Sequence, residues 1–445
     1  MFSMSGPDLA RFVFALAALL FACNLLGYIA ERLTVPRIIG EVAGGLILGP
    51  TLMGSVFPHA FHWLFLGFGS ESNLWGFIAE LGLILLLYNS GLKFQYRFEK
   101  ADAKIGLSII VASTVIPFII GWLATYVFHP AQFLGPDHSL MALKIVIAIS
   151  IAVTSIPVIS KIFSDLGIMH TRFAKIIVGI AGVHDIILFV ALAIATGIAA
   201  SHQGVNAVVL AKSLGVTFAF LFACMFVVPR VLKSITTKRA NLIFRASFLG
   251  YFLLIMLVLC DIAGYLNIDM MYGALLAGVA TKLTLPQHLV KRVENSVREI
   301  SFSLFIPLYF GIVGLQLNLA HNFSVGFFVL YLLFATVVQT LVVYFTCRAI
   351  KTDKSTSFNL AAAMNARGGP GIVLSQVAFA AGIINQNMFA ILVMLALFTS
   401  WMAGSWIRHV LKTGKRLMPG DENLVIEKAQ EDVDLDWSTE TSIVS

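Results

Sequence analysis

Ala181-Gly-Val-His-Asp185 places an acid in the middle of an apolar run that extends from Phe173 to about Ala199. About 20 apolar residues are enough to cross the hydrocarbon core of a membrane as a helix. An ionised carboxylate at the centre of such a helix costs about 2.5 to 3.5 kcal/mol on insertion scales, so it is seldom kept without a use. We therefore predict a membrane helix here, with Asp185 as an ion-binding residue.

The composition of the whole chain is that of a polytopic membrane protein. Of its 445 residues, 59% are hydrophobic and 12% are charged, which leaves too little polar surface to cover a soluble protein of this size. The net charge of +7 comes from basic residues in short groups between apolar runs, a pattern typical of cytoplasmic loops and not of nucleic-acid binding. The four cysteines are far apart and lack metal-ligand spacing, so we expect neither disulfides nor structural zinc.

The apolar runs predict an all-α fold with about 13 transmembrane helices. They are residues 10–29, 35–54, 74–92, 105–128, 141–163, 173–199, 205–228, 248–266, 270–285, 302–317, 325–346, 358–383 and 388–410. With the N-terminus outside and the C-terminus in the cytoplasm, 26 of the 30 Lys and Arg residues fall on the cytoplasmic side. The excess of positive charge inside supports this orientation.

Thirteen runs divide into six, one linker and six, which predicts two inverted six-helix repeats, as in many secondary transporters. The fifth run of each half is interrupted by polar residues, Pro and Gly, at Ser150–Pro157 and at Asn365–Gly371. Matched breaks of this kind point to a binding site at the membrane midplane. The alternative is that Pro and Gly only kink two ordinary membrane helices.

At an unwound segment, freed carbonyls and hydroxyls can coordinate a cation. Thr154 and Ser155 lie in the first break beside Pro157, and Gly368, Gly369 and Pro370 mark the second. Two such helices crossing beside Asp185 would enclose a small desolvated ion. We expect the only metal to be a monovalent cation at Asp185.

Several stretches resemble the monovalent cation/proton antiporter superfamily, in particular its branch of bacterial sodium/proton and potassium/proton antiporters. The resemblance covers about Leu33 to Val410. Its motifs are Pro36–Pro50 (PRIIGEVAGGLILGP), Glu80–Leu92 (ELGLILLLYNSGL), Thr154–Val158 (TSIPV), Val183–Asp185 (VHD) and Ala366–Gly371 (ARGGPG).

The resemblance implies a homodimer in the inner membrane of a bacterium. Residues 1–416 would form the transmembrane antiporter domain, with a rigid dimerisation part and a mobile core part interleaved. The core would carry Asp185, Thr154 and Ser155 between the two faces of the membrane by an elevator-type movement. The cargo would be a monovalent cation and protons, with no cofactor and no enzymatic reaction.

The chain departs from the family pattern at two site positions. Members that move net charge usually have an aspartate where His184 stands and a lysine where Gln339 aligns. Replacing both members of an ion pair avoids leaving one buried charge without its partner. Asp185 is then the only acid at the site, which predicts electroneutral exchange of Na⁺ or K⁺ for H⁺. A histidine can change charge near neutral pH, so the alternative is electrogenic exchange with His184 carrying a second proton.

Other polar residues within the runs need partners or a role. Arg367 is an intramembrane cation, and we predict a structural ion pair with Glu80 or, next, with Glu41. Asn89 is a further candidate to line the site.

The last residues, 417–445, form a short acidic segment that we expect to be a disordered cytoplasmic tail. No stretch of this chain has the pattern of a nucleotide-binding regulatory domain. A sodium-coupled organic-anion symporter is the other transporter class considered. A membrane enzyme lacks support, because no catalytic constellation is evident in the sequence.

Overall fold

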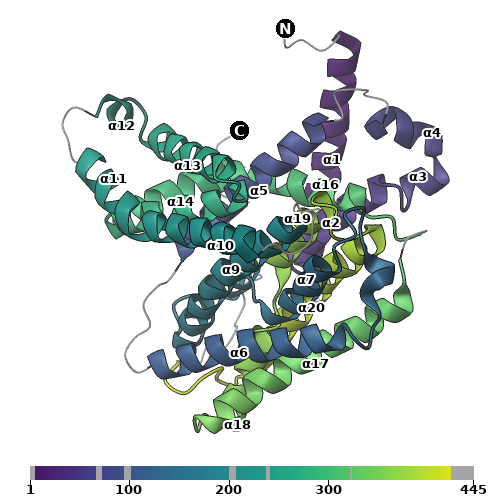
Figure 1. The fold of residues 1–445 in the computed structure, drawn as a ribbon. Helices are drawn as coiled ribbons and strands as arrows, with labels where there is room; N and C mark the ends of the chain where they lie inside the picture. The colour runs from purple at the N-terminus through teal and green to yellow at the C-terminus, as the bar shows by residue number, and fades with distance from the viewer. Residues whose placement is uncertain are drawn as a thin grey trace, which may run out of the picture.

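The predicted runs are helical in the structure, a computed structural model that describes residues 6–66, 73–94, 102–199, 207–236, 241–320 and 323–421 (Figure 1). Over these residues the only extended pairing is a bridge between Leu134 and Ile384, which confirms the all-α class. The helices are α1 (Gly6–Arg32), α2 (Arg37–Leu48), α3 (Met53–Val56), α4 (Pro58–Phe61), α5 (Asn73–Lys93), α6 (Ala103–Ala124), α7 (Leu140–Ala152), α8 (Ile156–Asp165), α9 (Arg172–Ala199), α10 (Ala207–Phe222), α11 (Val228–Thr236), α12 (Leu242–Ala246), α13 (Phe248–Tyr265), α14 (Met270–Thr284), α15 (Gln287–Ile300), α16 (Ile306–Gln316), α17 (Val325–Ala349), α18 (Lys354–Ala363), α19 (Gly368–Ala380) and α20 (Gln386–Lys412).

Eleven helical segments of the described chain are long and apolar enough to cross a membrane. The other two predicted runs, 270–285 and 358–383, correspond to α14, which has 15 residues, and to the broken pair α18 and α19. The seventh segment continues past the predicted end to Thr236, and the tenth begins before the predicted start, at Gln287. Both extensions are amphipathic helices, α11 and α15, which a search for continuous apolar residues leaves out.

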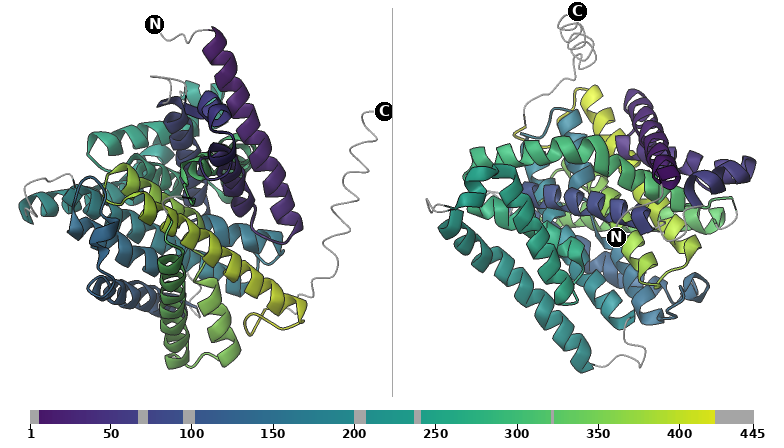
Figure 2. Two further views of the ribbon diagram at one scale, coloured as in Figure 1. Left: turned by 90° about the vertical axis from the view of Figure 1, so that its right-hand side faces the viewer. Right: turned by 90° about the horizontal axis from the view of Figure 1, so that it is seen from above.

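The helices separate into two groups according to the neighbours they pack against (Figures 1 and 2). We call α1, α2, α5, α13, α14 and α16 the scaffold group, and α6 to α9 with α17 to α20 the core group. Each group combines helices from both halves of the chain. In the scaffold group α1 packs on α2, which contacts α16, and α13 packs on α14, which contacts α5. This repeated arrangement is what two intertwined inverted repeats produce, as predicted.

Glycines allow the closest helix approaches within the scaffold group. A Cβ added at Gly45 of α2 would overlap the carbonyl of Gly311 in α16, and one at Gly278 of α14 would overlap the carbonyl of Tyr88 in α5. Gly45 lies within the Pro36–Pro50 motif quoted from the sequence. Only a residue without a side chain lets two helix backbones approach so closely.

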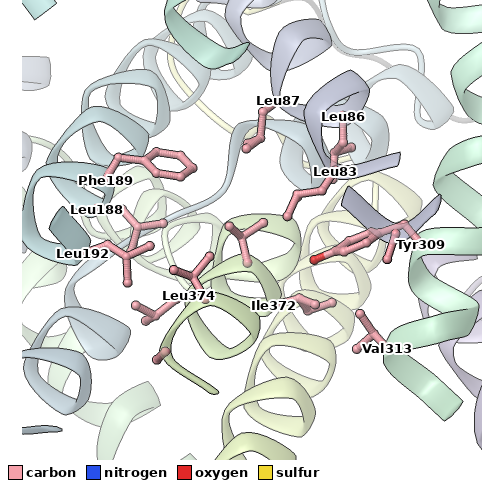
Figure 3. Close-up of a cluster of buried hydrophobic side chains, with 14 of the residues drawn as sticks. Leu83, Leu86, Leu87, Leu188, Phe189, Leu192, Tyr309, Val313, Ile372 and Leu374 are labelled. Carbon is pink, nitrogen blue, oxygen red and sulfur yellow. The ribbon is translucent and has the colours of Figure 1, made fainter. Parts of the chain in front are cut away.

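An apolar layer joins the two groups (Figure 3). It is made by buried side chains of α5 and α16 from the scaffold group and of α9 and α19 from the core group. In α9 these residues follow Asp185 in the sequence, and in α5 they precede Ser90. The labelled members of the layer are Leu83, Leu86, Leu87, Leu188, Phe189, Leu192, Tyr309, Val313, Ile372 and Leu374.

The first residues of the predicted tail are ordered, so the expectation of disorder is wrong for residues 417–421. Leu417 and Met418 are each 3% exposed. The Asp421 carboxylate accepts hydrogen bonds from the backbone N–H groups of Arg172 at 2.8 Å and Phe173 at 3.4 Å. An acceptor from a distant segment thus caps the start of α9. Residues 422–445 lie outside the described chain.

Asp421→Ala is expected to lower the free energy of unfolding by about 1 kcal/mol, because it removes the acceptor for two free N–H groups at a helix start. Thermal unfolding of the purified protein measures the loss. Asp261→Ala, which removes an exposed carboxylate of α13, is the matched control and should leave stability unchanged. Equal effects of the two variants would contradict the capping role.

Candidate ion-binding site

Asp185 lies in the middle of α9 and is completely buried. Its Oδ2 accepts a hydrogen bond from the Ser90 hydroxyl of α5 at 3.2 Å. Its Oδ1 has no hydrogen-bond partner within the described chain. The carboxylate therefore faces protein and not lipid, and one of its oxygens is free to bind a ligand.

The two predicted helix breaks cross beside this carboxylate. The backbone N–H of Ser155, between α7 and α8, donates to the carbonyl of Ala366, between α18 and α19, at 2.8 Å. The Thr154 hydroxyl donates to the Met364 carbonyl at 2.5 Å. α8 then begins at Ile156, whose backbone N–H lies close to Asp185. The crossing thus brings the positive end of a half-helix to the acid.

The unwound residues are fewer than the sequence indicated. Pro157 lies in the first turn of α8, and Gly368, Gly369 and Pro370 lie in the first turn of α19. Proline is well tolerated there, because the N–H that it lacks has no partner within the helix. Gly368 has φ +25°, and a Cβ at this position would overlap the Val158 side chain. These residues start the second half-helices, and the open segments are 153–155 and 364–367.

Arg367 is 1% exposed and is held by backbone carbonyls. Its Nε donates to the Ser150 carbonyl at 3.1 Å, and its Nη2 donates to the carbonyls of Ile151 at 3.2 Å and Ala335 at 2.9 Å. Its Nη1 donates to the carbonyl and side-chain oxygens of Asn365. The guanidinium therefore occupies the negative end of α7, where unpaired carbonyls favour a cation.

The predicted ion pair of Arg367 with Glu80 or Glu41 is wrong. Glu41 accepts from Arg37 of its own helix, with Nε and Oε1 2.9 Å apart, and Glu80 is exposed. Carbonyls of α7 and α17, together with Asn365, satisfy the guanidinium without a carboxylate.

The His184 side chain contacts different parts of the structure from those that the Asp185 side chain contacts. Its Nδ1 accepts from the Thr154 backbone N–H at 3.2 Å, and its Nε2 lies 3.2 Å from the Ser113 hydroxyl of α6. Because the Ser113 hydroxyl donates to the Ile109 carbonyl at 2.5 Å, it must accept from Nε2–H. This network assigns a neutral imidazole that links α6, α9 and the first break.

Two further buried side chains near the crossing have polar atoms without a hydrogen-bond partner in the described chain. They are the Ser155 hydroxyl and the amide of Gln339 in α17, both 0% exposed. Gln339 is one helical turn from Ala335, which binds Arg367, and is next to Thr340, which accepts from Asn365 at 2.9 Å. An unpaired buried polar group costs about 1 to 3 kcal/mol. Such groups beside a free carboxylate oxygen suit the binding of a cation or of water.

A sequence model of one family, described as "Sodium/hydrogen exchanger, transmembrane", matches residues 15–413. This chain belongs to that family. The matched range contains both breaks, Asp185 and Arg367, so the family assignment covers the whole crossing. The resemblance to monovalent cation/proton antiporters is thereby confirmed.

Relatives of this chain include proteins from plants, yeast and bacteria. The Arabidopsis thaliana protein "Cation/H(+) antiporter 17" is 27% identical, over 94% of this chain and 50% of the relative. The Saccharomyces cerevisiae protein "K(+)/H(+) antiporter 1" is 28% identical, over 89% of this chain and 46% of the relative. The Bacillus cereus protein "Na(+)/H(+)-K(+) antiporter GerN" is 22% identical, over 92% and 98%. The chain thus spans about half the length of the plant and yeast relatives.

Among solved structures, this chain is similar to the sodium proton antiporter MjNhaP1 from Methanocaldococcus jannaschii. The TM-score is 0.58, the identity is 16%, and the match covers 91% of this chain and 98% of the other. At this identity the similarity shows the fold, in agreement with the predicted antiporter architecture.

Ser90 is the residue beside Asp185 that the sequence did not indicate. The sequence suggested its neighbour, but Asn89 donates to the Leu85 carbonyl and to the Ser301 hydroxyl and not to Asp185. Adjacent residues of a helix point about 100° apart. Two neighbouring polar residues in an apolar run therefore indicate that the helix contacts a polar site, but not which of the two faces it. The signal was the Asn-Ser-Gly interruption itself.

Proposed function

We propose that this exchanger moves one monovalent cation, Na⁺ or K⁺, against one proton, with Asp185 binding each in turn. The observation that carries the proposal is the fully buried Asp185 carboxylate, which has one oxygen free beside the crossing. Relatives named as cation/proton antiporters support it. No cofactor is needed, because the ion gradients supply the energy.

The exchange follows from the cost of an uncompensated buried charge. An ionised carboxylate in an apolar surrounding is unfavourable by several kcal/mol, so the site moves across the membrane with either a proton or a cation bound. In our proposal the cation binds Asp185 Oδ1 and the Ser155 hydroxyl, the atoms without protein partners. Thr154 acts mainly by joining the two breaks, because its hydroxyl already donates to Met364.

One charge in each direction makes the exchange electroneutral. His184 carries no second proton in this proposal, because both its nitrogens are engaged as those of a neutral ring. Gln339 adds no charge at the position where related electrogenic antiporters have a lysine.

The movement is proposed to be an elevator in which the core group slides along the scaffold group, and the scaffold group forms a homodimer. The N-terminus would lie outside and the C-terminus in the cytoplasm of a bacterial inner membrane. In this orientation α9 runs outward and α5 runs inward. The members of the apolar layer, which follow Asp185 in α9 and precede Ser90 in α5, then lie on the outer side of Asp185, and in our proposal they close the site to the outside.

A symporter for an organic anion would need a basic group available to its substrate. The buried cation at the crossing, Arg367, already donates to carbonyls of α7, α17 and Asn365. This arrangement favours a cation as cargo.

The purified protein in liposomes tests the function and its charge balance together. An internal pH dye should respond to added Na⁺ or K⁺, while a solid-supported membrane carrying the same liposomes should record no transport current. A pH response with a current would contradict electroneutrality. No pH response to any alkali cation would contradict the exchange itself.

His184→Asn is expected to keep most of the exchange activity and an electroneutral ratio, because the Asn Oδ1 can replace Nδ1 as the acceptor for Thr154 N–H. His184→Ala should lose about 1 to 3 kcal/mol of stability, since that buried N–H is then unpaired. Thermal unfolding and the current measurement check both variants. A change of stoichiometry in His184→Asn would show that the ring carries a proton during transport.

A further inference from the structure

The hydrogen bond from Ser90 to Asp185 crosses the boundary between the two helix groups. Ser90 lies in α5 of the scaffold group and is 2% exposed, and Asp185 lies in α9 of the core group. A buried hydrogen bond to an ionised group is about twice as strong as one between neutral groups. A relative movement of the two groups must therefore act on this bond.

The residues around Ser90 are fixed to the scaffold group. The Tyr88 hydroxyl lies 3.1 Å from the Thr281 hydroxyl of α14, and Asn89 Nδ2 donates to the Ser301 hydroxyl at 3.3 Å. Gly91 packs against Gly278, with no space for a Cβ on either residue. Ser90 is thus held in place on both sides along α5 and cannot follow Asp185.

The Ser90 hydroxyl is also directed differently from other buried hydroxyls in these helices. Ser113, Thr399 and Ser400 each donate to a carbonyl four residues earlier in their own helix. Ser90 instead donates across to Asp185 Oδ2. Its proton is committed to the carboxylate.

The same face of α5 offers no second donor in the direction of the apolar layer. Leu86 and Leu83 lie four and seven residues before Ser90, and both belong to that layer (Figure 3). Residues at these spacings share one helix face. A carboxylate displaced along α5 toward the layer therefore loses the Ser90 donor and faces leucines of this helix. The polar atom of the layer is the Tyr309 hydroxyl of α16, which belongs to another helix.

We propose that Ser90 is a positioning residue of the scaffold group that stabilises Asp185 in one of the two end positions of the transport movement. The inference rests on the proposed exchange and adds a residue that sets the balance between the two end positions. With the site closed on the side of the apolar layer, the stabilised position is the one nearer the cytoplasm.

The test compares the apparent cation affinity of the exchanger at its two faces, in liposomes of sorted orientation. Ser90→Ala should weaken the affinity at the cytoplasmic face and strengthen it at the outer face, so that their ratio changes by about ten- to a hundredfold, as expected for the loss of one hydrogen bond to a charged group. Ser90→Cys, whose thiol is a weak donor, should give an intermediate ratio.

Ser375→Ala is the matched control, because this buried hydroxyl donates to the Ile372 carbonyl in its own helix at 2.7 Å. It should leave the ratio unchanged. An unchanged ratio in Ser90→Ala, or affinities that weaken equally at both faces, would refute the positioning role while leaving the exchange proposal intact. Absence of cation/proton exchange in the wild type would refute both.

Discussion

Asp185→Asn is expected to abolish cation-dependent proton movement, with a loss of about two orders of magnitude or more. The amide keeps the size of the side chain but cannot be neutralised by a proton or balance a bound cation. A cation at this buried position would then lack its counter-charge, at a cost of several kcal/mol, and each 1.4 kcal/mol corresponds to about a tenfold change. The initial rate of the pH-dye response in liposomes measures the loss.

Asp261→Asn is the control for this variant, because it makes the same substitution at an exposed carboxylate of α13. It should transport as the wild type does. Both proteins should also be compared by thermal unfolding, so that a folding defect is not taken for lost transport. Exchange by a folded Asp185→Asn protein would remove the proposed site.

Arg367→Met is expected to destabilise the protein by about 3 kcal/mol or more. The substitution leaves the carbonyls of Ser150 and Ile151, at the end of α7, without their donor, and each unpaired buried group costs about 1 to 3 kcal/mol. The crossing should then open, so transport should fall together with the yield of folded protein. The melting temperature and the elution profile of the detergent-purified protein check this expectation.

Two controls separate the observed geometry from the ion pair expected from the sequence. Arg245→Met removes an exposed arginine of α12 and should be neutral. Glu80→Gln should be neutral as well, because Glu80 is exposed and Arg367 binds carbonyls. A melting temperature of Arg367→Met equal to that of the wild type, or a strongly destabilised Glu80→Gln, would contradict the carbonyl-bound arginine.

The sequence predicted the helices, the breaks and the buried acid because these depend on local signals. A charge within an apolar run, here Asp185, can be recognised without knowing its neighbours. Breaks at 153–155 and 364–367 follow from polar residues, Pro and Gly within two apolar runs. The inverted repeats follow from the number of runs and the matching position of the breaks.

The contacts that the sequence did not predict depend on helix rotation and on distant segments. Which of Asn89 and Ser90 faces Asp185 is decided by how α5 is turned against α14. From the sequence, an acid was the expected partner of Arg367, because a buried charge usually pairs with the opposite charge. The sequence does not show that backbone carbonyls become available where α7 ends. The capping of α9 by Asp421 joins segments almost 250 residues apart, and acidic composition alone suggested a solvated chain.

The way Arg367 is held has a consequence for how the crossing responds to acid. A guanidinium stays protonated at all physiological pH values, and the peptide carbonyls around it neither gain nor lose protons. The electrical balance of the junction between the half-helices is therefore the same in acidic and in alkaline surroundings. In our proposal, acidification of either compartment can protonate the Asp185 carboxylate. The hydrogen bonds that hold the two half-helices together at Arg367 stay the same.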